Sequence, residues 1–348
     1  MKYHLSITSK FKMNIYWWIG CIVCVILLLA LIDVLAFSFL SFNSHRIFHP
    51  ERYEIALPEK LKSSSEHQTI EKGKMIAKTK KIVIACLARN AAHIFDKASK
   101  RIEMIGELFG DYKVLLFEND SVDRTRSLLK IWTHTNPQVE LLDCDDLGCK
   151  DCKFNLLDGY ALGAWHGDRM KRMAFLRNRY LSHFKDHCNH DYLMVYDFDL
   201  DGGISKEGIL HSIGCESQWD AVFANGRMRL PPFGISSSMY DGLAFVSSRK
   251  TDDLGIVARF IELSGLNEKG LLPVASAFNG LAIYKKECLR DARYHSVNDK
   301  LNCEHVGLHY DMIDAGYNRL YINSHMELEA GPQGPKNKFT TFFSFLFH

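Results

Sequence analysis

Closely spaced carboxylates follow an apolar run in the middle of the sequence. The run DYLMVY at 191–196 leads directly into Asp197, Phe198, Asp199, Leu200 and Asp201. Two carboxylates one residue apart can bind a hard divalent cation and, through it, a diphosphate. We favour Asp197 and Asp199 over the pair Asp199 and Asp201, because the first pair stands at the very end of the apolar run. An acidic turn without a ligand is the alternative.

Polar residues also follow two earlier apolar runs, 81–88 and 112–118. They are Arg89 and Asn90 after the first run, and Glu118, Asn119, Asp120 and Ser121 at the end of the second. Ligands of open parallel sheets bind at the carboxyl ends of the strands, so these residues and the acidic cluster are predicted to share one crevice. We assign Asn90, Glu118 and Asp120 to contacts with a nucleotide base or ribose. Simple turn capping is the alternative for Asp120.

The elements that must position these residues alternate between strand and helix. Apolar residues at helical spacing occupy 97–110 and 127–136, a further helix is predicted around 169–184, and short apolar runs at 81–88, 112–118, 139–146 and 191–196 are predicted strands. Strand, helix, strand order implies parallel pairing. The predicted fold class is α/β, with a sheet flanked by helices.

An uncharged segment of nineteen residues, 14–32, precedes this domain. As a helix it would be about 28 Å long, which matches the hydrocarbon thickness of a bilayer. Lys2, Lys10 and Lys12 come before it, whereas Arg46 and Arg52 are the only Lys or Arg between its end and residue 52. The positive-inside rule therefore predicts a single-pass type II protein. The predicted regions are a cytosolic tail at 1–13, a signal anchor at 14–42, a stem at 43–80, a folded domain at 81–330 and a tail at 331–348.

Net charge and cysteine content restrict the classes of partner and indicate the compartment. The chain has 43 Lys and Arg against 41 Asp and Glu, a net charge of +2, which excludes a basic nucleic-acid binder. Of ten cysteines, eight lie beyond the predicted anchor. On the luminal side of a membrane they can form disulfides, and a local disulfide among Cys144, Cys149, Cys152 and Cys188 is favoured over a zinc site.

Seven elements in order resemble a GT-A glycosyltransferase, most closely the fungal capsule-associated α-mannosyltransferases of glycosyltransferase family 69. They are the first strand, the strand ending in ENDS, the RMAFLRNRYL helix, the strand into DFD, PVASAFNGLAIY, NCEHVGLHYDMIDAGY and RLYINSHMEL. The resemblance covers roughly 81–330. It implies a GT-A type, Rossmann-like mixed sheet, a nucleotide-sugar donor, a glycan or glycoconjugate acceptor, and Mn²⁺ or Mg²⁺.

The resemblance also implies roles for individual residues. Asp197 and Asp199 match the metal-binding DxD pair, Asn279 and Gly280 match the glycine loop at the donor sugar, and His325 matches a carboxy-terminal metal-binding histidine. Glu304 matches the acidic residue facing the acceptor. It would accept a proton from the acceptor if the enzyme inverts, or orient the acceptor if it retains. The family carries Asn-Asp-Val where this chain has Asp-Phe-Asp, so the sugar and the stereochemistry stay open. GDP-mannose is the first donor to test.

Two motifs retain alternatives. The arginines of 169–179 are either a solvated helix face or a phosphate site, and by resemblance we assign Arg177 to the donor. DFDLDGG also resembles the first motif of haloacid-dehalogenase-type phosphatases, in which Asp199 would be the nucleophile and Asp201 the acid/base. A sugar-binding relative without turnover is a third reading. The compartment would be the Golgi or ER lumen in a eukaryotic or viral setting, and the cell envelope in a bacterial one.

Overall fold

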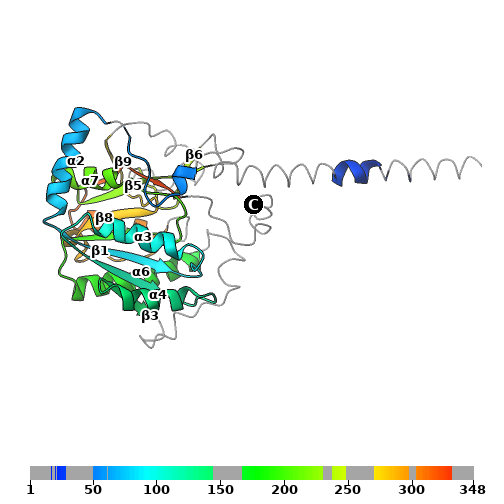
Figure 1. Cartoon of the computed structure of the whole chain (residues 1–348), viewed down its shortest axis with the longest axis horizontal. Helices are drawn as coiled ribbons and strands as arrows, with labels where there is room; N and C mark the ends of the chain where they lie inside the picture. The colour runs from blue at the N-terminus through cyan, green and yellow to red at the C-terminus, as the bar shows by residue number, and fades with distance from the viewer. Residues whose placement is uncertain are drawn as a thin grey trace, which may run out of the picture. The chain divides into compact units, whose positions relative to one another are not determined.

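The computed structural model describes residues 17, 20, 22–28, 50–60, 62–143, 167–229, 237–247, 270–297 and 303–330 (Figure 1). From residue 50 onward these residues, except Arg229, belong to one compact unit, and the helical segment 22–28 belongs to a second. Within the described part of the chain, no helix is both long enough and apolar enough to span a membrane. Most of the predicted anchor at 14–42, and all of the predicted tail at 331–348, lie outside the described residues.

The sheet is mixed and has nine strands, in the order β3-β2-β1-β4-β8-β5-β9-β7, with β6 pairing to β5. The strands are β1 Lys81–Ala88, β2 Asp111–Glu118, β3 Val139–Asp143, β4 Tyr192–Tyr196, β5 Ala221–Arg229, β6 Ser237–Met239, β7 Leu271–Pro273, β8 Leu281–Lys285 and β9 Leu320–Glu329. The first four are mutually parallel, and β8 runs antiparallel between β4 and β5. The predicted mixed α/β architecture is confirmed.

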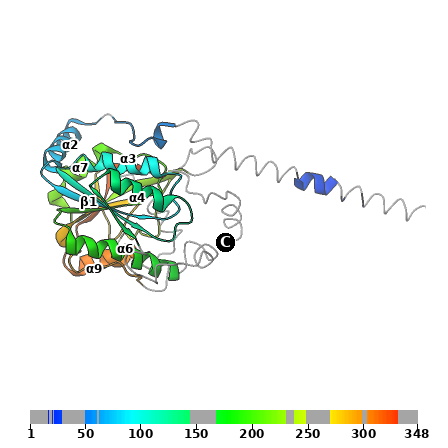
Figure 2. The same cartoon turned by 60° about the horizontal axis from the view of Figure 1, so that its bottom comes forward.

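Helices cover both faces of the sheet (Figure 2). They are α2 Ser64–Ala77, α3 Phe95–Gly106, α4 Thr125–Thr135, α6 Gly167–His187, α7 Lys206–Gly214 and α9 Glu304–Asp314, with short 3-10 turns at Pro50–Tyr53, Glu216–Gln218 and Lys286–Leu289. One core cluster joins α6 and α9 to the sheet, and the other joins α2, α3, α4 and α7 to its opposite face.

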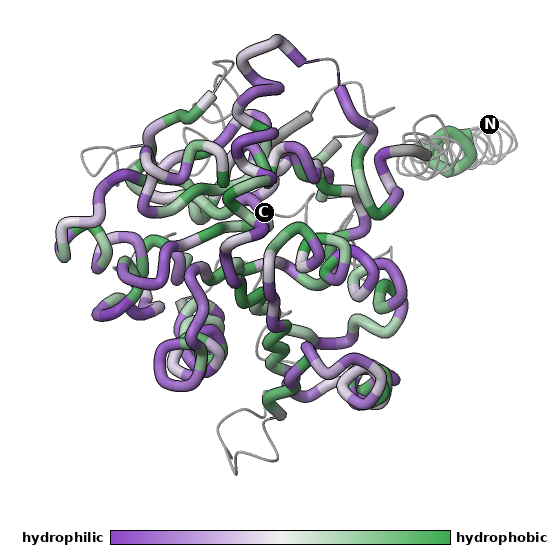
Figure 3. The backbone as a smooth tube through the Cα atoms, turned by 60° about the vertical axis from the view of Figure 1, so that its left-hand side comes forward, coloured by the Kyte–Doolittle hydropathy of each residue, from purple (hydrophilic) through white to green (hydrophobic). Residues whose placement is uncertain are grey.

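Strand β1 shows why the central runs are continuously apolar. Val83 and Ala85 pack into the α6 and α9 cluster, whereas Ile82 and Ile84 pack into the cluster on the other face. A parallel strand covered on both faces needs apolar residues at consecutive positions rather than at alternate ones. Helices such as α3 and α4 bury one side only, so hydrophobic and hydrophilic residues alternate along them, as they do along much of the backbone in Figure 3. Helix α7 is the exception, because residues 208–214 are all buried.

The region predicted as a stem is part of this unit from residue 50 onward. Helix α2 starts with a capping box in which Ser63 and Glu66 bond each other's backbone amides. It lies directly on α7, because a Cβ atom at Gly73 would meet the Leu210 carbonyl oxygen at 1.8 Å. Composition suggested a spacer here, whereas close glycine packing docks the helix on the domain.

The cysteines in the described part of the compact unit are Cys86, Cys188, Cys215, Cys288 and Cys303. All five are free and buried. Cys188 therefore forms no disulfide, which contradicts its predicted place in a local pairing. Cys144, Cys149 and Cys152 lie outside the described residues.

Candidate functional site

The three acidic residues after β4 have different surroundings. The Asp197 side chain is 21% exposed, and Asp199 is exposed. Asp201 instead accepts a hydrogen bond from Lys97 Nζ at 3.0 Å. Asp201 is thereby tied to a lysine of α3, and the choice of Asp197 and Asp199 as the ligand pair stays a prediction.

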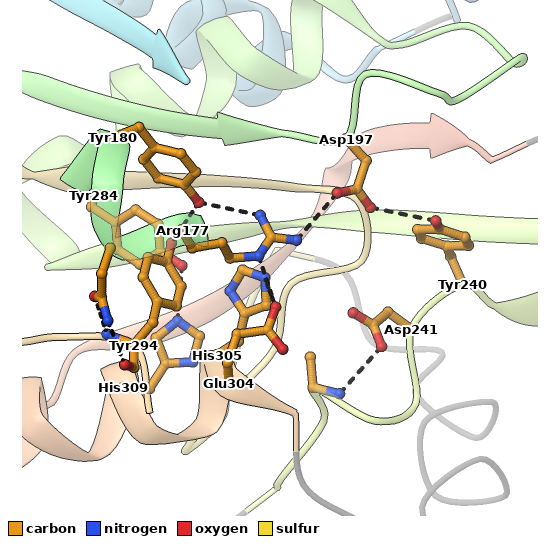
Figure 4. Close-up of polar contacts among 12 residues, drawn as sticks. Arg177, Tyr180, Asp197, Tyr240, Asp241, Tyr284, Tyr294, Glu304, His305 and His309 are labelled. Atoms are coloured by element: carbon orange, nitrogen blue, oxygen red, sulfur yellow. Dashed lines mark hydrogen bonds and ion pairs between the residues drawn. The ribbon is translucent and has the colours of Figure 1, made fainter. Parts of the chain in front are cut away.

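Arg177 is the centre of a buried polar cluster (Figure 4). Its Nε donates to Glu304 Oε1 at 2.7 Å, its Nη1 to the Tyr180 hydroxyl at 3.2 Å, and its Nη2 to Asp197 Oδ1 at 3.4 Å. The side chain is 6% exposed, and its guanidinium carbon lies 5.2 Å from the centre of the Phe278 ring. Burial alone lowers the pKa of Arg177, but Tyr180, Glu304 and Asp197 raise that pKa well above the ordinary value. Arg177 is therefore neither a solvated surface residue nor an open phosphate ligand.

Glu304 enters this cluster from the first turn of α9, where the helix dipole favours a carboxylate. It is 3% exposed and paired with Arg177. The next residue, His305, stacks on Phe278 with ring centroids 4.0 Å apart. Burial, followed by the charge of Arg177, lowers the pKa of His305 well below its usual value, which favours the neutral form of the ring. A carboxylate enclosed in this way is suited to orienting its neighbours.

The Asn279 and Gly280 turn lies directly beside the acidic cluster. The Asp197 amide donates to the Gly280 carbonyl at 3.1 Å. Asn279 and Gly280 have φ values of 56° and 89°, so the chain turns here before β8 begins at Leu281. The pair therefore forms the turn immediately before β8. The buried Asn279 amide donates to the Ala224 carbonyl at 2.8 Å, while its Oδ1 has no hydrogen-bond partner among the described residues.

The loops after β1 and β2 are bonded to each other, as predicted from a shared edge. Ser121 Oγ accepts from the Asn90 amide at 3.1 Å, and Asn90 Oδ1 accepts from the Val122 amide at 2.9 Å. Asn90 and Asp120 both have positive φ, 51° and 56°. Such backbone is uncommon outside glycine and marks these turns as closely defined.

Glu118 supports the second of these loops from below. It is fully buried, with Oε1 accepting from the Ser121 amide at 2.9 Å and Oε2 from Arg126 Nε at 2.7 Å. Both carboxylate oxygens are therefore engaged within the protein. Nearby, Arg89 Nε and Asn119 Nδ2 are buried donors without a hydrogen-bond partner among the described residues. Buried donors of this kind are normally satisfied by water or a bound molecule.

These strand ends lie level with one another. Ala88 pairs with Glu118, and Ala85 pairs with Val195, so the ends of β1, β2 and β4 meet at the same edge. The structure thus brings together the predicted residues Asn90, Glu118, Asp120, Asp197, Asp199, Asn279, Gly280, Arg177 and Glu304 at that edge.

His325 lies elsewhere. Its Nε2 is 3.6 Å from Glu66 Oε1 of α2, and its ring centroid is 4.3 Å from that of His211 on α7. Strands β8 and β5 separate β9 from β4, which places their backbones about 14 Å apart. The structure therefore does not bring His325 beside Asp197 as the resemblance implied.

Two residues of the site gave no signal in the sequence. Tyr240, after β6, donates from its hydroxyl to Asp197 Oδ2 at 3.4 Å. Asp241 follows it and accepts from the Ala244 amide at 3.3 Å. Burial, followed by the charge of Glu304, raises the pKa of Asp241 to about 6. Burial, with Asp199 and Asp241 adding to it, raises the pKa of Asp197 to about 7. Carboxylates from three separate elements thus share one electrostatic environment (Figure 4).

The raised pKa of Asp241 predicts how the free energy of unfolding depends on pH. The pKa of Asp241 is about 6 in the folded protein and about 3.9 in the unfolded chain, so folding takes up protons between these values. The free energy of unfolding should therefore fall as pH rises through this window. The side chain in Asp241→Asn stays neutral at every pH. The free energy of unfolding of this variant, relative to that of the wild type, should therefore be about 2–3 kcal/mol higher at pH 7 than at pH 4. Urea unfolding at both pH values measures this difference, and a constant difference would contradict the shared environment.

Asp197 and Asp199 could supply two of the ligands of a divalent cation, but not a complete set. Among the residues that the structure describes, no three His, Cys, Asp or Glu side chains form a group that could bind a metal ion. However, Asp197 and Asp199 are separated by a single residue, and the charge of Asp199 contributes to the raised pKa of Asp197. Mg²⁺ and similar hard cations are often bound by one or two carboxylates, with substrate phosphates and water completing the shell. Asp197 and Asp199 fit that arrangement.

Comparisons with known proteins gave structural neighbours only. No protein-family model and no curated protein matches the chain. Similar solved structures include S. aureus TarS 1-349, at 12% identity and TM-score 0.41 over 72% of this chain and 60% of that one. A second is the mannosyltransferase PcManGT from Pyrobaculum calidifontis in complex with GDP-Man and Mn²⁺, with 12% identity and a TM-score of 0.43 over 80% of this chain and 68% of that one. A third is M. tuberculosis glucosyl-3-phosphoglycerate synthase, with 12% identity and a TM-score of 0.42 over 82% of each chain.

The chain spans 60% of TarS 1-349. Identities of 12% and TM-scores of 0.41 to 0.43 carry no argument about the activity of this protein. A functional proposal has to rest on the residues at the strand ends.

Proposed function

We propose that this chain is a membrane-anchored glycosyltransferase of the GT-A type that transfers a sugar from a nucleotide-sugar donor to a glycan or glycoconjugate. The observation that supports this most directly is the cluster formed by Asp197, Arg177 and Glu304. These residues come from the end of β4, from α6 and from α9, and the resemblance to GT-A glycosyltransferases implied donor or acceptor roles for all three. The turn at Asn279 and Gly280 bonds to the same cluster through Asp197.

In this proposal Asp197 and Asp199 hold Mn²⁺ or Mg²⁺ together with the donor diphosphate. The cation would supply charge neutralisation for the leaving nucleoside diphosphate. Arg177 holds Asp197 and Glu304 in fixed positions, and Tyr240 bonds the other oxygen of Asp197. Glu304 is buried and ion-paired, which supports an orienting role over proton abstraction.

The loops after β1 and β2 are proposed to receive the nucleotide. Asn90 and Asp120 lie in the positive-φ turns at this edge. The buried donors Arg89 Nε and Asn119 Nδ2 are available to an acceptor atom of the base or ribose. Glu118 then acts from beneath the loop, because both its oxygens are already bonded.

The phosphohydrolase reading has less support. It needs Asp201 as the acid/base, yet Asp201 is bonded to Lys97. We therefore carry the glycosyltransferase proposal alone.

The membrane part of the proposal rests on residues 14–42 of the sequence. A single-pass type II arrangement would place residues from 43 onward in a Golgi or ER lumen, or in a cell envelope. Protease added to the cytosolic side of sealed membranes should then leave the folded unit intact. Its digestion from that side would reverse the proposed orientation.

The activity is tested with the full-length chain in detergent. GDP, UDP, GDP-mannose and UDP-GlcNAc are added with and without Mn²⁺ while the melting temperature is recorded. A ligand at 100 times its dissociation constant adds about 2.7 kcal/mol of stability, which is a shift of several degrees. We expect one nucleotide to give such a shift only with the metal, and its sugar donor to be hydrolysed slowly.

Two outcomes decide the proposal. A metal-dependent shift accompanied by release of the nucleoside diphosphate would support it and would name the donor. No shift with any nucleotide, together with hydrolysis of a phosphomonoester such as p-nitrophenyl phosphate, would contradict it and favour the phosphohydrolase.

A further inference from the structure

Residues 50–57, here called the strap, are bonded to the backbone just beyond the acidic cluster. The Gly203 amide donates to the Arg52 carbonyl at 2.8 Å, and the Leu57 amide donates to the Ile204 carbonyl at 3.0 Å. Ala56 pairs with Ile204 as a parallel bridge. The strap therefore runs alongside the end of the DFDLDGG segment, although about 150 residues separate the two in sequence.

Arg101 of α3 bonds the strap and this segment simultaneously. The side chain is fully buried. Its Nε donates to the Ile55 carbonyl at 3.1 Å and its Nη2 to the Glu54 carbonyl at 3.3 Å, both in the strap. Its Nη1 donates to the Leu200 carbonyl at 2.8 Å and to the Tyr196 hydroxyl at 2.9 Å. One guanidinium thus joins the strap to the end of β4 and to the residue after Asp199.

Lys97, one turn earlier on α3, repeats this arrangement. Its Nζ donates to the Tyr53 carbonyl at 2.8 Å and to Asp201 Oδ1 at 3.0 Å. Like Arg101, it bonds one group of the strap and one group of the acidic segment. Two cationic side chains on the same face of α3 therefore hold the strap in a fixed position relative to the acidic segment.

Gly202 and Gly203 are required by this close approach. A Cβ atom at Gly203 would lie 2.9 Å from the Glu54 carbonyl oxygen, and one at Gly202 would lie 2.1 Å from the Glu329 carbonyl oxygen. Neither glycine has positive φ, so their conformation is open to other residues. The glycines serve to admit the strap and β9 on either side of the segment.

We propose that the strap, Lys97 and Arg101 are a positioning device for Asp199. Asp199 is exposed, but Phe198 before it and Leu200 after it are buried, and Arg101 holds the Leu200 carbonyl. The direction of the Asp199 carboxylate is thereby set through its backbone by residues that touch no ligand. The catalytic benefit of this positioning rests on the proposed function. The hydrogen bonds that hold the strap are part of the fold and do not depend on it.

The test uses Lys97→Met in the full-length chain, since Lys97 is less buried than Arg101. Amide hydrogen exchange is followed at Gly203 and Ile204, whose amides bond the strap. Loss of the charged bonds should accelerate exchange there roughly ten- to a hundredfold, and leave amides of β1 unchanged. Lys100→Met, an exposed position on the same helix, is the matched control, and Lys97→Arg should restore slow exchange.

A second variant guards against an effect of Lys97 on folding alone. Gly203→Ala leaves both cations in place and pushes on the strap through its added Cβ atom. It should accelerate exchange at the Leu57 and Ile204 amides. Slow exchange in both Lys97→Met and Gly203→Ala would overturn the proposal.

The kinetic readout separates this inference from the proposed function. If a donor is hydrolysed, Lys97→Met should lower kcat roughly tenfold with little change in the donor KM, because a misplaced Asp199 affects the reacting geometry more than binding. Accelerated exchange with unchanged kcat would overturn the positioning role. If the wild type hydrolyses no nucleotide sugar, the proposed function fails, and the exchange data still decide whether the strap holds the segment.

Discussion

Asp199→Asn is expected to lower the rate of donor hydrolysis roughly a thousandfold, because a metal bound at the leaving diphosphate contributes several kcal/mol to the transition state. The melting temperature without ligand should change little, since Asp199 is exposed. The measurement is the rate of nucleoside diphosphate release from the donor identified by thermal shift, with Mn²⁺ present.

Two further variants help to interpret that result. Asp186→Asn makes the same chemical change at an exposed position of α6 and should leave the rate unaltered. His325→Ala should also retain activity if His325 stays beside Glu66 and His211. A loss as large as that of Asp199→Asn would return His325 to the ligand set. Full activity in Asp199→Asn would refute the proposed metal pair.

Arg177→Met is expected to destabilise the protein by about 3–5 kcal/mol, the usual cost of leaving a buried charge unpaired. Glu304 is 3% exposed and would lose its 2.7 Å partner, and Asp197 would lose the same cation. Urea unfolding at neutral pH measures the change in the free energy of unfolding. Lys171→Met, on an exposed position of the same helix, should stay within about 0.5 kcal/mol of the wild type.

A double variant tests whether the cost arises from the unpaired carboxylate. Adding Glu304→Gln to Arg177→Met removes the stranded charge, so the pair should be less destabilised than the sum of the two single variants by about 1–3 kcal/mol. Simple additivity would mean that Arg177 stabilises the fold through its packing on Phe278 rather than through the ion pair.

The sequence by itself determined the four parallel strands β1 to β4 and the edge at which they end. Periodicity is a local property, so the apolar runs of β1, β2 and β4 could be recognised without any knowledge of their neighbours. Parallel pairing then placed the residues after these runs at one edge, and the positive-φ turns at Asn90 and Asp120 lie there. The position of Asp197 and Asp199 followed from the same reasoning.

Tertiary structure alone decided how the side chains at that edge are used. Arg177 and Glu304 are 127 positions apart, and only the packing of α6 and α9 on one face of the sheet makes them partners. The insertion of β8 and β5 between β4 and β9 separates His325 from the acidic cluster. Strand order, helix packing and the path of the strap are long-range features, and a local pattern of residue types does not encode them.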